Sequence, residues 1–174
     1  VRVSQSHFRN DDVRAMVVNS GNANACTGLR GLEDAKAMAR ATAGALGLRQ
    51  QQVAVCSTGI IGVPLPVDRV LAGIPGLASD LRASHWPKLA RAIMTSDTKP
   101  KTYAIEVPCE GGSFRVGGIA KGAGMICPNM ATMLCFITTD AKIGKAELSK
   151  AVRHATDLSF NRITIDGDTS TNDT

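Results

Sequence analysis

The most informative stretch of the chain reads Lys121-Gly-Ala-Gly-Met-Ile-Cys-Pro-Asn-Met-Ala-Thr-Met-Leu134. It places Thr132 between a glycine-rich loop and an apolar run that is typical of a buried strand. A threonine hydroxyl is a weak nucleophile unless a base lies beside it, and an N-terminal threonine can use its own α-amine as that base. Cleavage of the Ala131–Thr132 bond would create such an N-terminus. The alternative is that Thr132 is only a β-branched residue at the start of a strand.

The residues before Thr132 favour a tightly folded loop. Gly122 and Gly124 allow the backbone to pack closely, and Pro128 and Asn129 favour a turn. A phosphate-binding loop is a weaker interpretation, because Lys121 and the glycines after it match neither G-x-x-x-x-G-K-[ST] nor G-x-G-x-x-G.

The 174 residues are 44% hydrophobic, 20% charged and only 3% aromatic. This composition is typical of a soluble globular protein, and the length predicts one domain whose core is filled by aliphatic side chains. The net charge of +5 comes from scattered basic residues, and few aromatic side chains are available for stacking on bases. We therefore expect small anionic molecules, and not nucleic acid, as partners.

The sequence shows no signal peptide and no apolar run long enough to cross a membrane, so we expect a cytoplasmic protein. Its five cysteines and three histidines lack metal-ligand spacing, which predicts reduced thiols and no metal site. The chain begins at Val1 without a methionine and ends at Thr174 in a polar loop. We expect it to be a fragment of a longer protein.

Strand-like and helix-like hydrophobic patterns are mixed along the chain, which predicts an α/β or α+β fold. The predicted strands are Val13–Val18, Gln52–Cys56, Tyr103–Val107, Ser113–Ile119, Met133–Thr138 and Arg162–Ile165. The predicted helices are Gly31–Gly47, Val67–Ala72, Trp86–Met94 and Lys145–Leu158. Two glycines after Glu110 predict a hairpin between the third and fourth strands.

Three further polar segments are candidates for a site. Ser57-Thr58-Gly59 follows a predicted strand, where a hydroxyl and a backbone N–H can stabilise an oxyanion, although a plain glycine turn is the simpler explanation. The segment 95–100 is either a helix-end loop or a set of hydroxyls that bind a polar substrate. The segment 166–174 has Thr171 where an EF-hand requires glycine, which excludes that calcium site and leaves a pocket-lining loop or a surface turn.

Six segments together resemble the ornithine acetyltransferase family of arginine biosynthesis, the self-cleaving glutamate N-acetyltransferases. They are Val18-Asn-Ser-Gly-Asn-Ala-Asn-Ala-Cys26, Cys56-Ser-Thr-Gly-Ile-Ile-Gly62, Met94-Thr-Ser-Asp-Thr98, Lys121-Gly-Ala-Gly-Met-Ile126, Pro128-Asn-Met-Ala-Thr-Met-Leu134 and Asp166-Gly-Asp-Thr-Ser-Thr-Asn-Asp173. Each is weak alone, but all six occur in the family's order across nearly the whole chain. The resemblance implies a mixed α/β self-processing fold with β-sheets packed against helices.

The resemblance also implies that the precursor cleaves itself between Ala131 and Thr132. Residues 1–131 would be the α-subunit portion and residues 132–174 the start of the β subunit, within one incomplete domain. Thr132 would be the catalytic nucleophile.

The remaining site residues follow from the same resemblance. Thr58 and Gly59 would form the oxyanion hole, and Thr98, Lys121 and Thr132 would bind substrate. Independently of the resemblance, the charge of Lys121 suits a substrate carboxylate. The chain holds less than half of a full-length member, so we expect it to lack part of the substrate pocket.

The implied reaction moves an acetyl group from N-acetylornithine to glutamate through an acetyl-threonine, without metal or cofactor. Some family members also accept acetyl-CoA as donor, and the family is usually an α2β2 assembly. Two alternatives stay open: an amidohydrolase or aminopeptidase with the same N-terminal threonine, in which water accepts the acyl group, and a non-catalytic binding domain.

Overall fold

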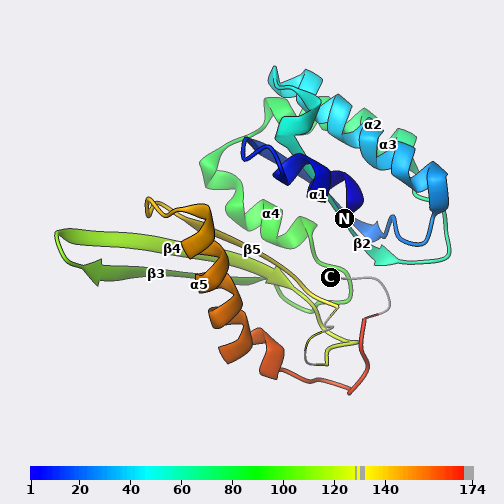
Figure 1. Ribbon diagram of the computed structural model, residues 1–174. Coiled ribbons are helices and arrows are strands. Elements are labelled where there is room, and N and C mark those ends of the chain that lie inside the picture. The colour runs from blue at the N-terminus through cyan, green and yellow to red at the C-terminus, as the bar shows by residue number, and fades with distance from the viewer. Residues whose placement is uncertain (128, 130–131, 171–174) are drawn as a thin grey trace. The chain divides into compact units, whose positions relative to one another are not determined.

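The computed structural model describes residues 1–127, 129 and 132–170, and the chain packs as two compact units (Figure 1). The first unit is Val1–Thr95 and the second is Ser96–Thr174. Each unit is described by itself below. We still only predict that the chain is one incomplete domain, in which the α subunit ends at residue 131 and the β subunit begins at residue 132.

The first unit is built on a parallel pair of strands joined by a long helix. Strand β1 (Ala15–Asn22) pairs with β2 (Val53–Ile60) over their whole length, from Ala15 opposite Val53 to Asn22 opposite Ile60. Parallel neighbours need a crossover connection, which α2 (Gly28–Leu46) and a short 3₁₀ turn, η1 (Gln50–Gln52), provide. The other helices of this unit are α1 (Arg2–Phe8), α3 (Val67–Ser79), η2 (Ala83–His85) and α4 (Trp86–Ala92).

The core of the first unit lies between this strand pair and α2 and α3. Apolar residues spaced three and four apart place one face of α2 inward. The buried cluster comprises Val17, Met38, Ala39, Ala43, Val53, Leu65 and Ile74. Gly47 ends α2 in the left-handed conformation with φ 67°, so the predicted stop at this glycine is confirmed.

The second unit contains a three-stranded antiparallel sheet in the order β3-β4-β5. Its strands are β3 (Lys101–Cys109), β4 (Gly112–Lys121) and β5 (Leu134–Thr139), followed by α5 (Lys145–Leu158) and η3 (Phe160–Arg162). The predicted hairpin is confirmed, with Gly111 at φ 85° in the tight connection between β3 and β4. The helix predicted over Lys145–Leu158 is confirmed with the same bounds.

Most predicted bounds differ from the structure by a few residues, including the helix predicted at Trp86–Met94, which ends at Ala92. The larger differences are the following. Residues Arg162–Ile165, which are predicted to be a strand, do not form one in the structure. Ile163 and Ile165 are exposed, and Ile165 instead donates its N–H to the carbonyl of Ile126 at 2.9 Å. Strands β1 and β2 also run further than predicted, so Ser57-Thr58-Gly59 lies within β2 and not in a turn after it. Helix α3 continues past Ala72 to Ser79, and α1 was not predicted.

The described architecture is mixed α/β, as predicted, with a parallel pair in one unit and an antiparallel sheet in the other. Among the described residues no helix is both long enough and apolar enough to span a bilayer.

Candidate functional site

In the first unit, the carboxyl ends of the two parallel strands bring two predicted segments side by side. The register places Ser20 opposite Thr58 and Gly21 opposite Gly59. Ligands commonly bind at this edge of parallel sheets. The asparagine-rich segment after Val18 and the Ser-Thr-Gly segment therefore form one surface.

Gly59 makes this close approach possible. Its φ is 132°, and a β-carbon at this position would lie 2.2 Å from the carbonyl carbon of Gly21 and 2.4 Å from the nitrogen of Asn22. No side chain fits there, since real β-carbons do not approach backbone atoms this closely. Glycine is therefore required by the packing as well as by the backbone conformation.

Several hydroxyl and amide groups near Thr58 are held by hydrogen bonds. The hydroxyl of Ser57 accepts from the N–H of Asn24 at 2.8 Å and donates to the carbonyl of Asn22 at 3.2 Å. The hydroxyl of Ser20 donates to the carbonyl of Met94 at 2.8 Å. These bonds fix the strand ends around Thr58.

Thr58 itself is fully buried, and its hydroxyl has no hydrogen-bond partner. Among the described residues, only Asn19 Oδ1, Thr58 Oγ1 and Thr132 Oγ1 are buried side-chain polar atoms in this state. Buried polar groups are normally paired, so each exception calls for an explanation. Two of the three belong to residues that the sequence predicts to be catalytic.

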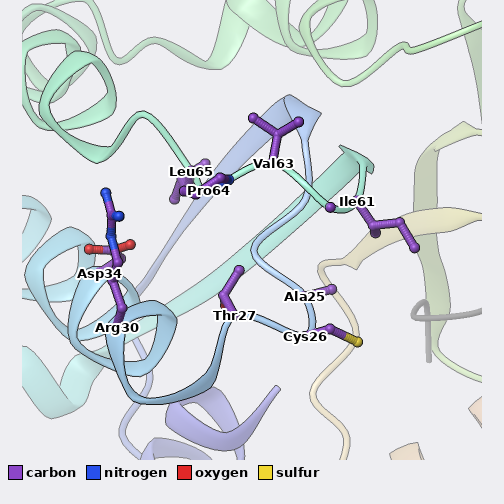
Figure 2. Close-up of a pocket in the computed structure, with 10 residues that line it drawn as sticks. Ala25, Cys26, Thr27, Arg30, Asp34, Ile61, Val63, Pro64 and Leu65 are labelled. Atoms are coloured by element: carbon purple, nitrogen blue, oxygen red, sulfur yellow. The ribbon is translucent and has the colours of Figure 1, made fainter.

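A hollow of about 330 Å³ lies near the same edge of the first unit (Figure 2). Loops that follow β1 and β2 and the first turns of α2 form its walls. Its lining comprises Ala25, Cys26, Thr27, Arg30, Asp34 and residues 61–65. None of the predicted site residues lines it.

In the second unit, the loop between β4 and β5 folds back on itself. Thr132, near the end of this loop, therefore contacts residues from the first half of the loop. The backbone N–H of Thr132 donates to the carbonyl of Met125 at 2.9 Å. Gly122 has φ 148°, and a β-carbon there would lie 3.1 Å from the Thr132 carbonyl oxygen. The predicted close packing of Gly122 around Thr132 is thus present.

Asp166 holds the middle of this loop. Its carboxylate accepts from the N–H of Met125 at 2.7 Å and of Ile126 at 3.2 Å. The bond from Met125 is the main cause that lowers the pKa of Asp166 below its ordinary value, and donation from Asp168 and Ile126 acts in the same direction. The carboxylate is therefore ionised at neutral pH.

Asp97 holds the start of the loop. Its fully buried carboxylate accepts from the N–H of Gly122 at 2.8 Å and pairs with the ammonium of Lys101. The neighbouring Lys121 is 1% exposed at the end of β4. Thr98 is exposed in the bend that follows Asp97.

The structure thus groups the predicted residues in two sets. Thr58 and Gly59 lie together on β2, whereas Lys121 and Thr132 lie at the two ends of one loop in the other unit. Ala131, the residue before the predicted cleavage point, lies outside the described residues, as do residues 171–174. The roles assigned to all these residues remain predictions. Asp97 and Asp166 lie in segments that the sequence marks as site candidates, but their individual hydrogen bonds to Gly122 and Met125 span 25 and 41 residues and have no local signal. Asn19, in the segment that follows Val13–Val18, also has no individual role in the prediction.

Comparison with known proteins gives one consistent family. The ArgJ family matches residues 1–174. "Arginine biosynthesis bifunctional protein ArgJ" of Symbiobacterium thermophilum is 53% identical over 173 residues, which cover 99% of this chain and 43% of that protein. The protein of the same name from Geobacter sulfurreducens is 54% identical over 161 residues, covering 92% of this chain and 41% of that protein. The chain therefore spans about two fifths of the length of the curated relatives it matches.

Two solved structures share the fold. The arginine biosynthesis bifunctional protein ArgJ of Bacillus halodurans is 39% identical with a TM-score of 0.67, covering 76% of this chain and 69% of that one. The ornithine acetyltransferase of Mycobacterium tuberculosis, solved in complex with ornithine, is 40% identical with a TM-score of 0.68, covering 74% and 68%. On the match over its whole length, the chain belongs to the ArgJ family.

Proposed function

We propose that the full-length protein transfers an acetyl group from N-acetylornithine to glutamate, in arginine biosynthesis, through an acetyl ester on Thr132. The observation that carries the proposal is the pair of buried, unpartnered hydroxyls of Thr58 and Thr132 in a chain of the ArgJ family. The relatives named for arginine biosynthesis and the relative solved with ornithine support the substrate class.

The first step of the proposal is self-cleavage. The Thr132 hydroxyl attacks the carbonyl carbon of Ala131, the C–N bond breaks, and the Thr132 nitrogen takes up a proton to become an amine. Water then hydrolyses the resulting ester, which frees Thr132 as a new N-terminus. The hydroxyl, now beside its own α-amine, has the base that a threonine nucleophile needs.

The second step is transfer in two halves. The α-amine of Thr132 accepts the hydroxyl proton as Oγ1 attacks the acetyl carbonyl, and ornithine leaves with a proton on its nitrogen. The amino group of glutamate then attacks the acetyl ester, the bond between the acetyl carbon and Oγ1 breaks, and Oγ1 takes up the proton that the glutamate nitrogen loses, so that N-acetylglutamate leaves and Thr132 is regenerated. In both halves Thr58 and Gly59 donate hydrogen bonds to the oxyanion, a role in which one lost donor typically costs ~10²–10³-fold in rate.

The proposal assigns substrate binding to Thr98 and Lys121. It further includes acetyl-CoA as a second donor, an α2β2 assembly of the cleaved chains and a cytoplasmic location, all of which follow from the family resemblance. The proposed reaction uses no metal or organic cofactor.

Mass spectrometry of a full-length family polypeptide that contains this chain tests the proposal. We expect a fragment that begins at Thr132, and acetylglutamate when N-acetylornithine and glutamate are supplied. Thr132→Ala should abolish both, whereas Thr132→Ser, which keeps a hydroxyl, should retain measurable cleavage. Normal cleavage in Thr132→Ala would refute the assignment. Release of free acetate without acetylglutamate would favour the hydrolase instead.

A further inference from the structure

Met125 has an unusual backbone conformation beside the proposed nucleophile. Its φ is 50°, in the left-handed region, which is costly for a non-glycine residue and persists only where neighbouring contacts hold it. In this conformation its carbonyl accepts the hydrogen bond from the Thr132 nitrogen at 2.9 Å. The strained residue thus contacts the atom that becomes the α-amine after cleavage.

The contacts that hold Met125 come from the segment around Asp166, 41 residues further along the chain. Both carboxylate oxygens are used: Oδ2 accepts from Met125 N–H at 2.7 Å, and Oδ1 accepts from Ile126 N–H at 3.2 Å. The backbone adds one bond, from the N–H of Ile165 to the carbonyl of Ile126 at 2.9 Å. Together these bonds fix the orientation of the peptide groups on both sides of Met125.

We propose that Asp166 is a positioning residue for Thr132, because it holds Met125 so that the Met125 carbonyl orients the Thr132 nitrogen. This inference rests on the proposed function. An α-amine can rotate about its bond to the α-carbon, and it acts as a base only when its lone pair faces the hydroxyl. One N–H bond to a fixed carbonyl restricts that rotation, and such orientation is a major source of rate in enzymes.

Asp166 is suited to a test because it is exposed, so its replacement removes little buried surface. We expect Asp166→Ala, in the full-length polypeptide, to lower kcat for acetyl transfer by about 100-fold, the scale of a 1 Å misplacement. Asp166→Asn keeps one acceptor oxygen and should lower kcat by about tenfold. The KM values should change less than about twofold, since Asp166 contacts the loop and not the substrate in this proposal.

The matched control is Asp168→Asn. The side chain of Asp168 takes no part in these bonds, and only its backbone N–H, which the substitution keeps, donates to Asp166. Its kcat should stay within about twofold of the wild type. All values of kcat are expressed per chain that begins at Thr132, so that a change in cleavage is not counted as a change in transfer. A folded Asp166 variant that does not cleave also supports the proposal, since the nitrogen that the Met125 carbonyl orients is the leaving group in cleavage.

Two results would overturn the inference. One is a kcat within twofold of the wild type in both Asp166 variants. The other is loss of the cooperative melting transition in Asp166→Asn, which would assign Asp166 to stability alone. Failure of the proposed function is a different outcome, because it appears already in the wild type as the absence of cleavage at Thr132 or of acetylglutamate.

Discussion

Gly59 packs against the backbone of Gly21 across the parallel pair so closely that no side chain fits at Gly59. A β-carbon at Gly59 would lie 2.2 Å from the carbonyl carbon of Gly21, and the φ of Gly59 is 132°. Gly59 is also one of the two residues to which we assign the oxyanion hole. The same backbone geometry therefore serves the packing of β2 against β1 and the placement of Thr58.

Gly59→Ala should destabilise the protein, because the contact is with backbone and cannot be relieved by a side-chain rotation. We expect a loss of about 2 kcal/mol or more in the free energy of unfolding, measured by urea titration. The control is Gly44→Ala in α2, where a β-carbon meets nothing within 4 Å. That change should raise stability by about 0.5–1 kcal/mol. Equal effects in both variants would contradict the packing argument.

Thr58→Val should separate stability from activity. Valine has nearly the same shape, and the Thr58 hydroxyl has no hydrogen-bond partner to lose. The free energy of unfolding should therefore stay within about 1 kcal/mol of the wild type or rise. Turnover should fall by ~10²–10³-fold if the hydroxyl stabilises the oxyanion. Thr58→Ser, which keeps the hydroxyl, should retain more activity; an unchanged turnover in Thr58→Val would exclude the oxyanion role.

The elements that could be predicted from the sequence are those with local signals. The residues that predict helix α5, Lys145–Leu158, are its own, because the helical spacing of its apolar side chains lies within that segment. The hairpin is predicted by Gly111, which adopts the positive φ that the tight turn requires. The strand predicted at 162–165 fails because β-branched residues alone do not make a strand. A strand needs a neighbour, and Ile165 pairs its N–H with Ile126 in a loop instead.

The residues of the candidate site also divide into those that the sequence identifies and those that only the folded chain reveals. Thr132 and Thr58 were found because whole segments resemble a known family, and their unpartnered hydroxyls agree with a special role. Asp97 and Asp166 were not assigned any role, because their hydrogen bonds to Gly122 and Met125 span 25 and 41 residues. Contacts at such a distance depend on the path of the folded chain, which one sequence without its structure does not reveal.

Asp97 should be more important for stability than its partner Lys101. The Asp97 side chain is fully buried and also accepts from the Gly122 N–H, whereas the Lys101 side chain is 43% exposed. Asp97→Ala leaves a buried donor unpaired and should cost about 3 kcal/mol in the free energy of unfolding. Lys101→Ala should cost less, about 1.5 kcal/mol, because it removes one partner of the buried Asp97 carboxylate while the Gly122 N–H still donates to it. Urea titration of both variants measures the difference, and a larger loss in Lys101→Ala would contradict it.

Asp12 should give the first unit a stability that depends on pH at the acidic end. Its carboxylate accepts from the side chains of Arg14, Gln52 and Arg49 at 2.8, 2.8 and 2.7 Å. The hydrogen bond from Arg14 is the largest cause that lowers the pKa of Asp12 below its ordinary value of 3.8, and the bond from Gln52 is the next. Because the pKa of Asp12 is lower in the folded state than in the unfolded state, ionised Asp12 stabilises the protein at pH values above the unfolded-state pKa. This stabilisation is lost as the pH falls through the folded-state pKa.

The expected result is that the difference in Tm between the wild type and Asp12→Asn is constant from about pH 5 to 7 and closes below about pH 4. High salt should reduce this difference in Tm at neutral pH, because the ion pairs of Asp12 with the two arginines are exposed to solvent. Asp34→Asn removes a carboxylate of the same unit without these three donors, and so controls for the general effect of acid. Thermal melts at each pH measure the difference. A difference in Tm between the wild type and Asp12→Asn that stays the same down to pH 2 would contradict this prediction. It would show that the stabilisation by Asp12 does not depend on the charge of its carboxylate.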